Sequence, residues 1–365
     1  MLNIYKYMTT FLKQLLQSKG IRKVEEKGLK LMERNAYFDN ARWILMFFVV
    51  FGHTIQPFTE ENHIIDVTYH WIYTFHMPAF IFVAGFFAKG NLTKEYVLHL
   101  MKKLLLPYAA FQVLYTVYYF LIGKEDWLHL PFEPHWALWF LVSLFCWHLL
   151  LYWYKRLPKY MALFIAVQLG IIVGYMDPIG HMFSLSRTFV FFPFFLLGYW
   201  FSQKEIQWLT QWRVKGIGLI VMATTAFLLV ITPNFSIDWF LSSKSYATME
   251  MSEWGGMARL GVYTISAIMM FSVLSWIPSK EYRWSKYGTR TLYVYLLHGL
   301  FIHVFREYEL FSVNSFLDGA MLAVLSILIT WILSSHKVAL LSKPLIEMYK
   351  YIPVRKRQHT NSYNV

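Results

Sequence analysis

Hydrophobic runs of membrane-spanning length recur along the chain, and charged residues gather in the short stretches between them. As helices, these runs are long enough to cross about 30 Å of hydrocarbon, although polar residues interrupt several of them. They cover residues 38–57, 67–88, 103–123, 135–154, 160–176, 187–203, 214–232, 257–277, 291–306 and 316–341. The pattern predicts an all-α, polytopic membrane protein with about ten transmembrane helices.

The segments that flank these runs are basic. Residues 1–36 combine apolar positions at helical spacing with lysines and arginines, which fits an amphipathic cytosolic segment on an anionic membrane surface or, equally, a solvated basic tail. This segment lacks the compact apolar core and cleavage site of a signal peptide, so we expect it to be retained. Residues 343–365 predict a basic cytosolic tail. A single transmembrane domain, residues 37–342, is expected between the two.

The distribution of charge predicts the orientation of the chain. If the N-terminus is cytosolic, the inner loops hold most of the lysines and arginines between residues 89 and 290. The outer loops and helix ends, which are rich in carboxylates, then hold only Lys124, Arg187, Lys244, Arg259 and Arg306. Since positive residues are retained on the cytosolic side of a membrane, this asymmetry predicts an N-in/C-in topology in the plasma membrane.

Composition excludes several classes of protein. With 57% hydrophobic, 20% aromatic and 15% charged residues, the chain is not an ordinary soluble domain. Its net charge of +13 is not gathered in a soluble, aromatic-interleaved patch, so we expect membrane lipid and no nucleic acid as a partner. The single cysteine, Cys146, excludes an intramolecular disulfide and a multi-cysteine metal site.

The first hydrophobic run carries ionisable residues at both ends. In a helix, the eleven-residue step from Arg42 to His53 returns to almost the same face, about 16 Å further along the axis. An ionisable side chain within a membrane segment usually lines a functional cavity. The alternative is that Arg42 extends to the cytosolic headgroups while His53 is a core histidine with its hydrogen bonds satisfied.

Two further histidines lie within hydrophobic runs. His76 is followed by Pro78, which frees a backbone carbonyl at a depth where it must be buried or hydrated. His298 lies in the ninth run. One such histidine is readily explained as structural, but three on separate helices favour a functional role. Three histidines can bind zinc, yet these have no metal-binding spacing, and we predict no metal site.

Cations and tryptophans at the ends of other runs are candidate binding residues. Lys102 and Lys103 lie at a predicted cytosolic mouth, where they could meet the phosphates of a nucleotide-bearing donor or serve topology alone, which we favour. Trp136 and Trp139 could stack on a sugar ring, or belong to the aromatic belt at the membrane surface.

Two arginines lie at predicted outer ends of helices. Arg187 and Arg259 could clamp an anionic or hydroxyl-rich acceptor. Each could equally pair with a carboxylate of an outer loop. The sequence leaves these two roles open.

Several of these segments resemble acyltransferase family three, the membrane O-acyltransferases that include polysaccharide O-acetylases and fucose 4-O-acetylase-like proteins. Asp39, Arg42 and His53 match the D-x-x-R-x(10)-H signature of the first helix in that family. Further motifs follow in the family's order, in residues 75–78, 82–87, 102–108, 136–138 and 292–298. The resemblance covers residues 37–342.

The resemblance implies a reaction and roles for these residues. It implies transfer of acetyl from cytosolic acetyl-CoA to a hydroxyl of a cell-surface or lipid-linked carbohydrate, with no bound cofactor. His53 is then the expected general base, and Arg42, His76 or His298 would orient the donor or stabilise the oxyanion. Ala84 stands where many members of the family carry serine, so that position is given no catalytic hydroxyl.

Two other classes of function remain open at this point. An exporter of a polysaccharide or its precursor would use the same polar residues to bind or relay rather than to catalyse. A structural membrane subunit of an envelope-synthesis complex is the third. Within the enzyme interpretation, no motif holds a serine or cysteine beside a base, which gives an acyl-serine or acyl-cysteine intermediate little support. The sequence leaves an acyl-histidine intermediate open, and we expect direct attack on the thioester because it needs only one base and one oxyanion stabiliser.

Overall fold

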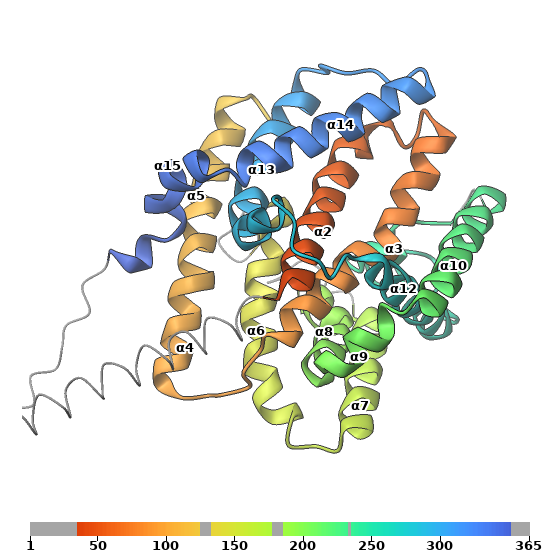
Figure 1. Cartoon of the computed structure of the whole chain (residues 1–365). Coiled ribbons are helices and arrows are strands. Elements are labelled where there is room, and N and C mark those ends of the chain that lie inside the picture. The colour runs from red at the N-terminus through yellow and green to blue at the C-terminus, as the bar shows by residue number, and fades with distance from the viewer. Residues whose placement is uncertain (1–34, 125–132, 177–184, 233–234, 352–365) are drawn as a thin grey trace, which may run out of the picture.

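The computed structural model describes residues 35–124, 133–176, 185–232 and 235–351. The regular elements in these ranges are all helices, which confirms the all-α prediction. The predicted amphipathic segment up to residue 34 and the basic tail beyond residue 351 lie outside the described residues. Figure 1 shows the helices packed into one bundle around α2.

Helix α2 (Ala36–Ile55) is the centre of the bundle. The side chain of Asn35 caps its first turn by accepting a hydrogen bond from the backbone N–H of Tyr37, at 3.0 Å. The helix contacts α3 (His63–Phe86), α13 (Thr291–Glu307) and α14 (Phe316–Leu333). Leu45 and Val50 are completely buried. The helix that carries Arg42 and His53 therefore faces protein on several sides.

Asn40 fixes the loop that precedes α13 against the start of α2. Its amide nitrogen donates hydrogen bonds to the carbonyls of Pro278 and Lys280, at 2.8 and 2.9 Å, and its oxygen accepts one from the Ser285 hydroxyl at 2.6 Å. The 3₁₀ turn Ser285–Arg290 packs directly on α2, because Gly288 has no side chain to keep it from the Asp39 carbonyl. A buried amide is satisfied in this way by three partners.

Helices α3 and α8 (Leu185–Trp200) touch through their backbones. A Cβ atom on Gly85 would lie 2.1 Å from the carbonyl oxygen of Phe195. Reciprocally, a Cβ atom on Gly198 would lie 2.0 Å from the carbonyl oxygen of Phe82. Small residues allow helices in membranes to approach this closely.

The other helices surround this centre. In chain order they are α4 (Lys94–Leu100), a π-helical turn (Met101–Leu105), α5 (Leu106–Leu121), α6 (Trp139–Tyr154), α7 (Lys159–Ile172), α9 (Gln203–Leu209), α10 (Trp212–Ile231), α11 (Asp238–Leu241), α12 (Gly255–Trp276) and α15 (His336–Ile346). The predicted run 316–341 is divided between α14 and α15, because Ser335 caps a new helix by accepting a hydrogen bond from the N–H of Val338.

Five of the described helices are long and apolar enough to cross a membrane. They are Lys94–Leu121, Trp136–Tyr154, Trp212–Ile231, Gly255–Trp276 and Phe316–Leu333, and Lys159–Tyr175 and Leu185–Trp200 are shorter apolar helices. This supports a membrane protein. The count of ten spans and the N-in/C-in orientation stay predictions.

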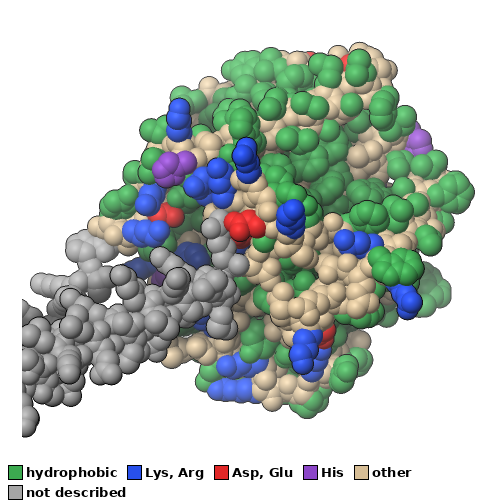
Figure 2. Space-filling view, in the orientation of Figure 1, with side chains coloured by type: hydrophobic (Ala, Val, Ile, Leu, Met, Phe, Trp, Pro, Cys, Tyr) green, Lys and Arg blue, Asp and Glu red, His purple; other side chains and the backbone are tan. Residues whose placement is uncertain are grey.

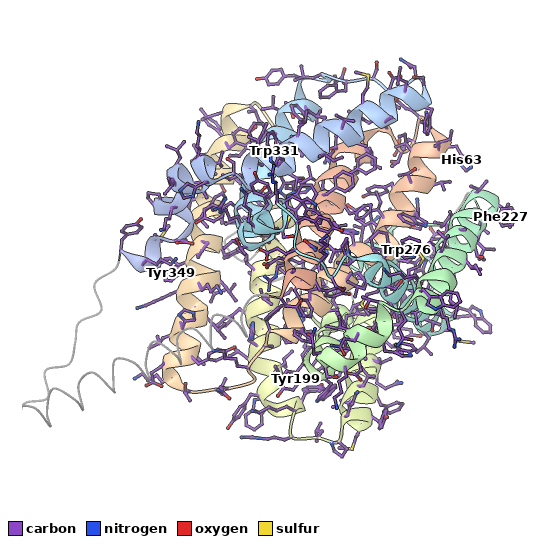
Figure 3. The ribbon with its side chains drawn as sticks, in the orientation of Figure 1. His63, Tyr199, Phe227, Trp276, Trp331 and Tyr349 are labelled. Carbon is purple, nitrogen blue, oxygen red and sulfur yellow. The ribbon has the colours of Figure 1, made fainter. Side chains whose placement is uncertain are left out.

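The surface agrees with a lipid environment. Ile220 and Phe227 on α10 are 67% and 62% exposed, and Figure 3 shows Phe227 at the edge of the bundle. In Figure 2, lysines and arginines lie over the middle and lower parts of the visible face, whereas hydrophobic side chains cover most of its upper part around α14. In water, so large an apolar surface would be unfavourable.

Candidate active site

The centre of the bundle brings together two of the predicted histidines and one predicted tryptophan. His53 from α2 and His298 from α13 have ring centroids 5.7 Å apart. Trp136, in the 3₁₀ turn Trp136–Leu138 before α6, contacts both, with centroid distances of 4.4 and 4.9 Å. These residues, which three separate elements supply, form what we call the central group.

The imidazoles of this group keep free nitrogen atoms. Nδ1 of His298 lies 3.0 and 2.8 Å from the carbonyl oxygens of Val294 and Tyr295. Because a carbonyl only accepts, the proton of a neutral ring is on Nδ1, and Nε2 is left as an acceptor. Among the described residues, neither this Nε2 nor Nδ1 of His53 has a hydrogen-bond partner. Buried polar atoms without a partner are uncommon in proteins, and an unoccupied binding position is one explanation for them.

His76 lies close to the central group but does not join it. It is 3% exposed, its Nδ1 lies 3.0 Å from the carbonyl oxygen of Ile72 on its own helix, and its ring packs on Tyr73 at 4.4 Å. The carbonyl of its own helix thus gives one ring nitrogen a structural partner. Its expected role in orienting the donor stays a prediction.

Arg306 is a site residue that the sequence assigned only to an outer helix end. Its Nη2 donates hydrogen bonds to the backbone carbonyl of His53 at 2.6 Å and to Oε1 of Gln56 at 2.8 Å. In a regular helix the His53 carbonyl would accept from the residue four positions later, but that residue is Pro57, which has no N–H. The proline therefore frees the carbonyl that Arg306 occupies. A proline four residues after His53 was the signal in the sequence.

Trp136 is held tightly against α13. A Cβ atom on Gly299 would lie 2.4 Å from the Trp136 ring, so the glycine makes room for the indole. The indole also contacts the ring of His303 at 4.8 Å and the guanidinium of Arg306 at 5.9 Å. Its backbone φ of 41° is unusual for a bulky residue. Strain of this kind is typical of functional sites.

Two cavities lie beside the central group, on opposite sides of His53 along α2. The first, of about 30 Å³, is narrow and lined by His53 with Met46, Val49, Met77, Phe80 and Tyr295 among others. The second, of about 370 Å³, is lined by Thr54, Phe58, Glu61, Arg306, Glu309 and Phe311 among others. Along α2, the residues that line the first cavity end at His53, and those that line the second begin at Thr54. We call the first the inner cavity and the second the outer cavity.

The predicted donor-binding cations lie beyond the inner cavity, toward the N-terminal end of α2. Arg42 donates from Nη1 to Oδ1 of Asp39 at 3.2 Å, and its guanidinium lies 4.4 Å from the centre of the Phe87 ring. Lys103, in the π-helical turn, is within electrostatic range of Arg42. Lys102 is its neighbour in the same turn. Both lysines and Arg42 thus lie toward one end of the bundle, and Arg42 does not contact His53.

Of the predicted acceptor-binding residues, Trp139 and Arg187 lie near the site. Trp139 lines the inner cavity, and the guanidinium of Arg187 lies over its ring at 5.0 Å. Arg187 Nε donates to the carbonyl of Leu241 at 3.1 Å. The substrate-binding roles stay predictions.

Arg259 lies elsewhere. It is 1% exposed, and its Nη1 donates to the carbonyl of Trp239 at 2.6 Å and to the hydroxyl of Ser242 at 2.9 Å. The structure thus gives it partners around α11, away from the central group. Binding of an acceptor by Arg259 stays a prediction.

A second polar cluster beside the central group was not anticipated. Tyr119 on α5 lies with its hydroxyl 2.6 Å from Nε2 of His303, one of the residues that touch Trp136. Thr116, on the same helix, lies 2.8 Å from Nε2 of His135, which immediately precedes Trp136. Both histidines stand in the sequence within or beside hydrophobic runs, and that is the signal that could have found them.

The described residues contain no group of three or more histidine, cysteine, aspartate or glutamate side chains placed to hold a metal ion.

The fold and the site together define a class of protein: a helical membrane protein with a group of imidazoles in its interior and a cavity on either side of His53. The family model described as an acyltransferase domain matches residues 35–335. The chain therefore belongs to acyltransferase family 3, as its motifs indicated. No match is found among curated proteins or among solved structures.

Proposed function

We propose that the protein transfers an acetyl group from cytosolic acetyl-CoA to a hydroxyl of a cell-surface or lipid-linked carbohydrate, and that it acts in the plasma membrane. Its family supports acyltransferase activity in general. The observation that carries the finer proposal is a pair of cavities on either side of His53: His53 lines the inner one, and Thr54, the next residue, lines the outer one. Two substrates could then approach one imidazole from opposite ends.

In the proposed reaction, the imidazole of His53 takes the proton of the acceptor hydroxyl as its oxygen attacks the thioester carbonyl. The tetrahedral intermediate then collapses, the C–S bond breaks, and the CoA thiolate leaves with the proton held on His53. Nε2 of His298, which can only accept while the ring is neutral, would receive a hydrogen bond from the acceptor or share the proton.

Arg306 is our candidate for stabilising the oxyanion. Its Nη2 is engaged by the His53 carbonyl and Gln56, but its Nε–H has no partner among the described residues. A cationic N–H aimed at developing negative charge is the usual device for this purpose. Arg42 lies about 16 Å from His53 along the helix axis. We therefore propose that it binds a part of the donor away from the thioester.

The size of the inner cavity supports a short acyl group. About 30 Å³ is enough for a water-sized group or a small acyl methyl, and its walls of methionine, valine and phenylalanine are apolar. The phosphates of the donor would then lie at the opposite end of the bundle from the acceptor, near Lys102, Lys103 and Arg42. A polysaccharide exporter would need a wider passage beside His53 than this cavity supplies.

The test is an assay of purified protein with acetyl-CoA and membranes of the native host as the source of acceptor. We expect release of free CoA that depends on the acceptor. Without acceptor, no burst of one equivalent of CoA and no stoichiometric label on the protein should be seen, because attack is direct. Acceptor-independent release with label trapped on a histidine would replace this mechanism with a two-step one. Absence of any CoA release from folded protein would contradict the proposed function.

A further inference from the structure

The outer cavity has the dimensions and walls of a carbohydrate site. It occupies about 370 Å³ between the α2–α3 connection and the last turn of α13 with the loop after it. Pro57, Phe58, Phe305 and Phe311 give it apolar and aromatic walls. Such faces stack on sugar rings, and a volume of this order accommodates a ligand of a few rings or fewer.

The cavity lies next to the proposed base. Thr54, the residue after His53, lines it, and so does Arg306, which holds the His53 carbonyl. Nε of Arg306 is buried and without a partner among the described residues. A polar group of the acceptor that enters the cavity would therefore meet an unsatisfied donor next to the reacting centre.

The charge of the lining is negative. Glu61 and Glu309 are exposed at its rim, and Arg306 is the only cation among its lining residues. The positive charge of Arg306 is partly compensated by the two oxygens that its Nη2 contacts. Glu60 in the α2–α3 connection and Glu307 at the end of α13 are neighbours of lining residues, are also exposed, and add to the negative potential.

We infer that the outer cavity is the acceptor site and that it selects by charge. It takes a carbohydrate that is uncharged or carries an amino group near the reacting hydroxyl, and it rejects one with a phosphate or a carboxylate at that place. The carboxylates at the rim accept hydrogen bonds from hydroxyl or ammonium groups and repel anions. The assignment to an acceptor rests on the proposed function, whereas the charge selectivity of the cavity does not.

Charged thiol reagents measure this selectivity without knowledge of the acceptor. A cysteine replaces Ser312, which lines the cavity, in a chain where Cys146→Ser has removed the native thiol. The probes are a cationic trimethylammonioethyl and an anionic sulfonatoethyl methanethiosulfonate. Each forms a mixed disulfide with the thiolate as methanesulfinate leaves. Phe311→Cys provides a second position in the same cavity.

We expect the cationic probe to react at least about tenfold faster than the anionic one, after normalisation to free cysteine, because a negative cleft concentrates cations. Glu61→Gln combined with Glu309→Gln is the matched change, since it removes both charges while keeping the shapes. It should bring the ratio close to one, as should high salt. A ratio at or below one in the parent, or a ratio that the two glutamines leave unchanged, overturns the charge selectivity.

The second part of the experiment tests the assignment to the acceptor. Modification of Ser312→Cys should stop acceptor-dependent release of CoA, with the unmodified variant as reference. Modification of Met251→Cys, at an exposed position outside the cavity, should leave it unchanged. Undiminished release after complete modification in the cavity would show that the acceptor uses another path. If unmodified protein releases no CoA, the proposed function fails while the charge measurement remains valid.

Discussion

The contact between Arg306 and the His53 carbonyl is predicted to set the position of the proposed base. In Arg306→Gln the buried His53 carbonyl loses its partner, and Pro57 prevents the helix from supplying another. Hydrogen bonds to a charged group contribute roughly 1.5–3 kcal/mol each, and Arg306 makes two here, to His53 and Gln56. Allowing for a partial replacement by glutamine, we expect a loss of about 2–4 kcal/mol in stability and at least about a tenfold fall in kcat.

The proline offers a way to separate this contact from other effects of losing the arginine. Pro57→Ala restores an N–H that can donate to the His53 carbonyl. While Arg306 is present, this substitution alone should change the free energy of unfolding little. In the Arg306→Gln background it should recover about 1 kcal/mol, the net value of one backbone hydrogen bond. The measurements are thermal unfolding in detergent and release of CoA for the four members of the cycle.

If the effects of the two substitutions on unfolding simply add, the proline does not create the need for Arg306, and the structural explanation is refuted. Recovery of stability without recovery of kcat would support an additional role for the Arg306 side chain at the oxyanion. Wild-type kcat in a folded Arg306→Gln variant would remove Arg306 from the site.

Four further predictions concern the base, the donor, the packing and the topology. His53→Ala should lower acyl transfer by about a hundredfold or more without loss of folding, since a general base is removed; near-normal turnover would exclude this role. Arg42→Lys should be severely impaired, because lysine cannot form a planar bidentate contact, whereas full activity would indicate a purely topological arginine. Gly85→Ala should lower the melting temperature by several degrees or prevent accumulation of the protein, because its Cβ would overlap the Phe195 carbonyl; an unchanged melting temperature would contradict the close contact. With Cys146 replaced, a cysteine at Glu61 should react with an impermeant reagent in intact cells and one at Lys159 should not, and the reverse would overturn the N-in orientation.

The family and the helical class could be predicted from the sequence because both depend on local pattern. Hydrophobic runs of spanning length specify helices, and the spacing from Asp39 to His53 lies within one helix, so no knowledge of packing was needed. The break between α14 and α15 was missed, because the caps at Ser334 and Ser335 are weak signals inside a hydrophobic stretch.

The composition of the central group depended on contacts that the sequence does not encode locally. His53 and His298 were candidates on separate helices, but their meeting across Trp136 follows from how α2 and α13 pack. Arg306 was assigned to an outer end, and its role became visible only with the contact to the carbonyl that Pro57 frees. Arg259, like Arg306, is an arginine that was assigned to an outer helix end. Its neighbours around α11 give it different partners.

The reciprocal glycine contact between α3 and α8 limits how the protein can move during turnover. A shift of one residue along either helix would bring the side chain of Ala84 or Phe86 against the carbonyl that now faces Gly85, and Gly198 imposes the same limit from the other side. These helices can neither slide nor rotate past each other without separating. The two helices therefore behave as one rigid unit. We expect the motions that admit and release substrates to come from the elements around this unit. An alternating-access carrier needs two halves that rock past each other, and this contact opposes such a motion between α3 and α8.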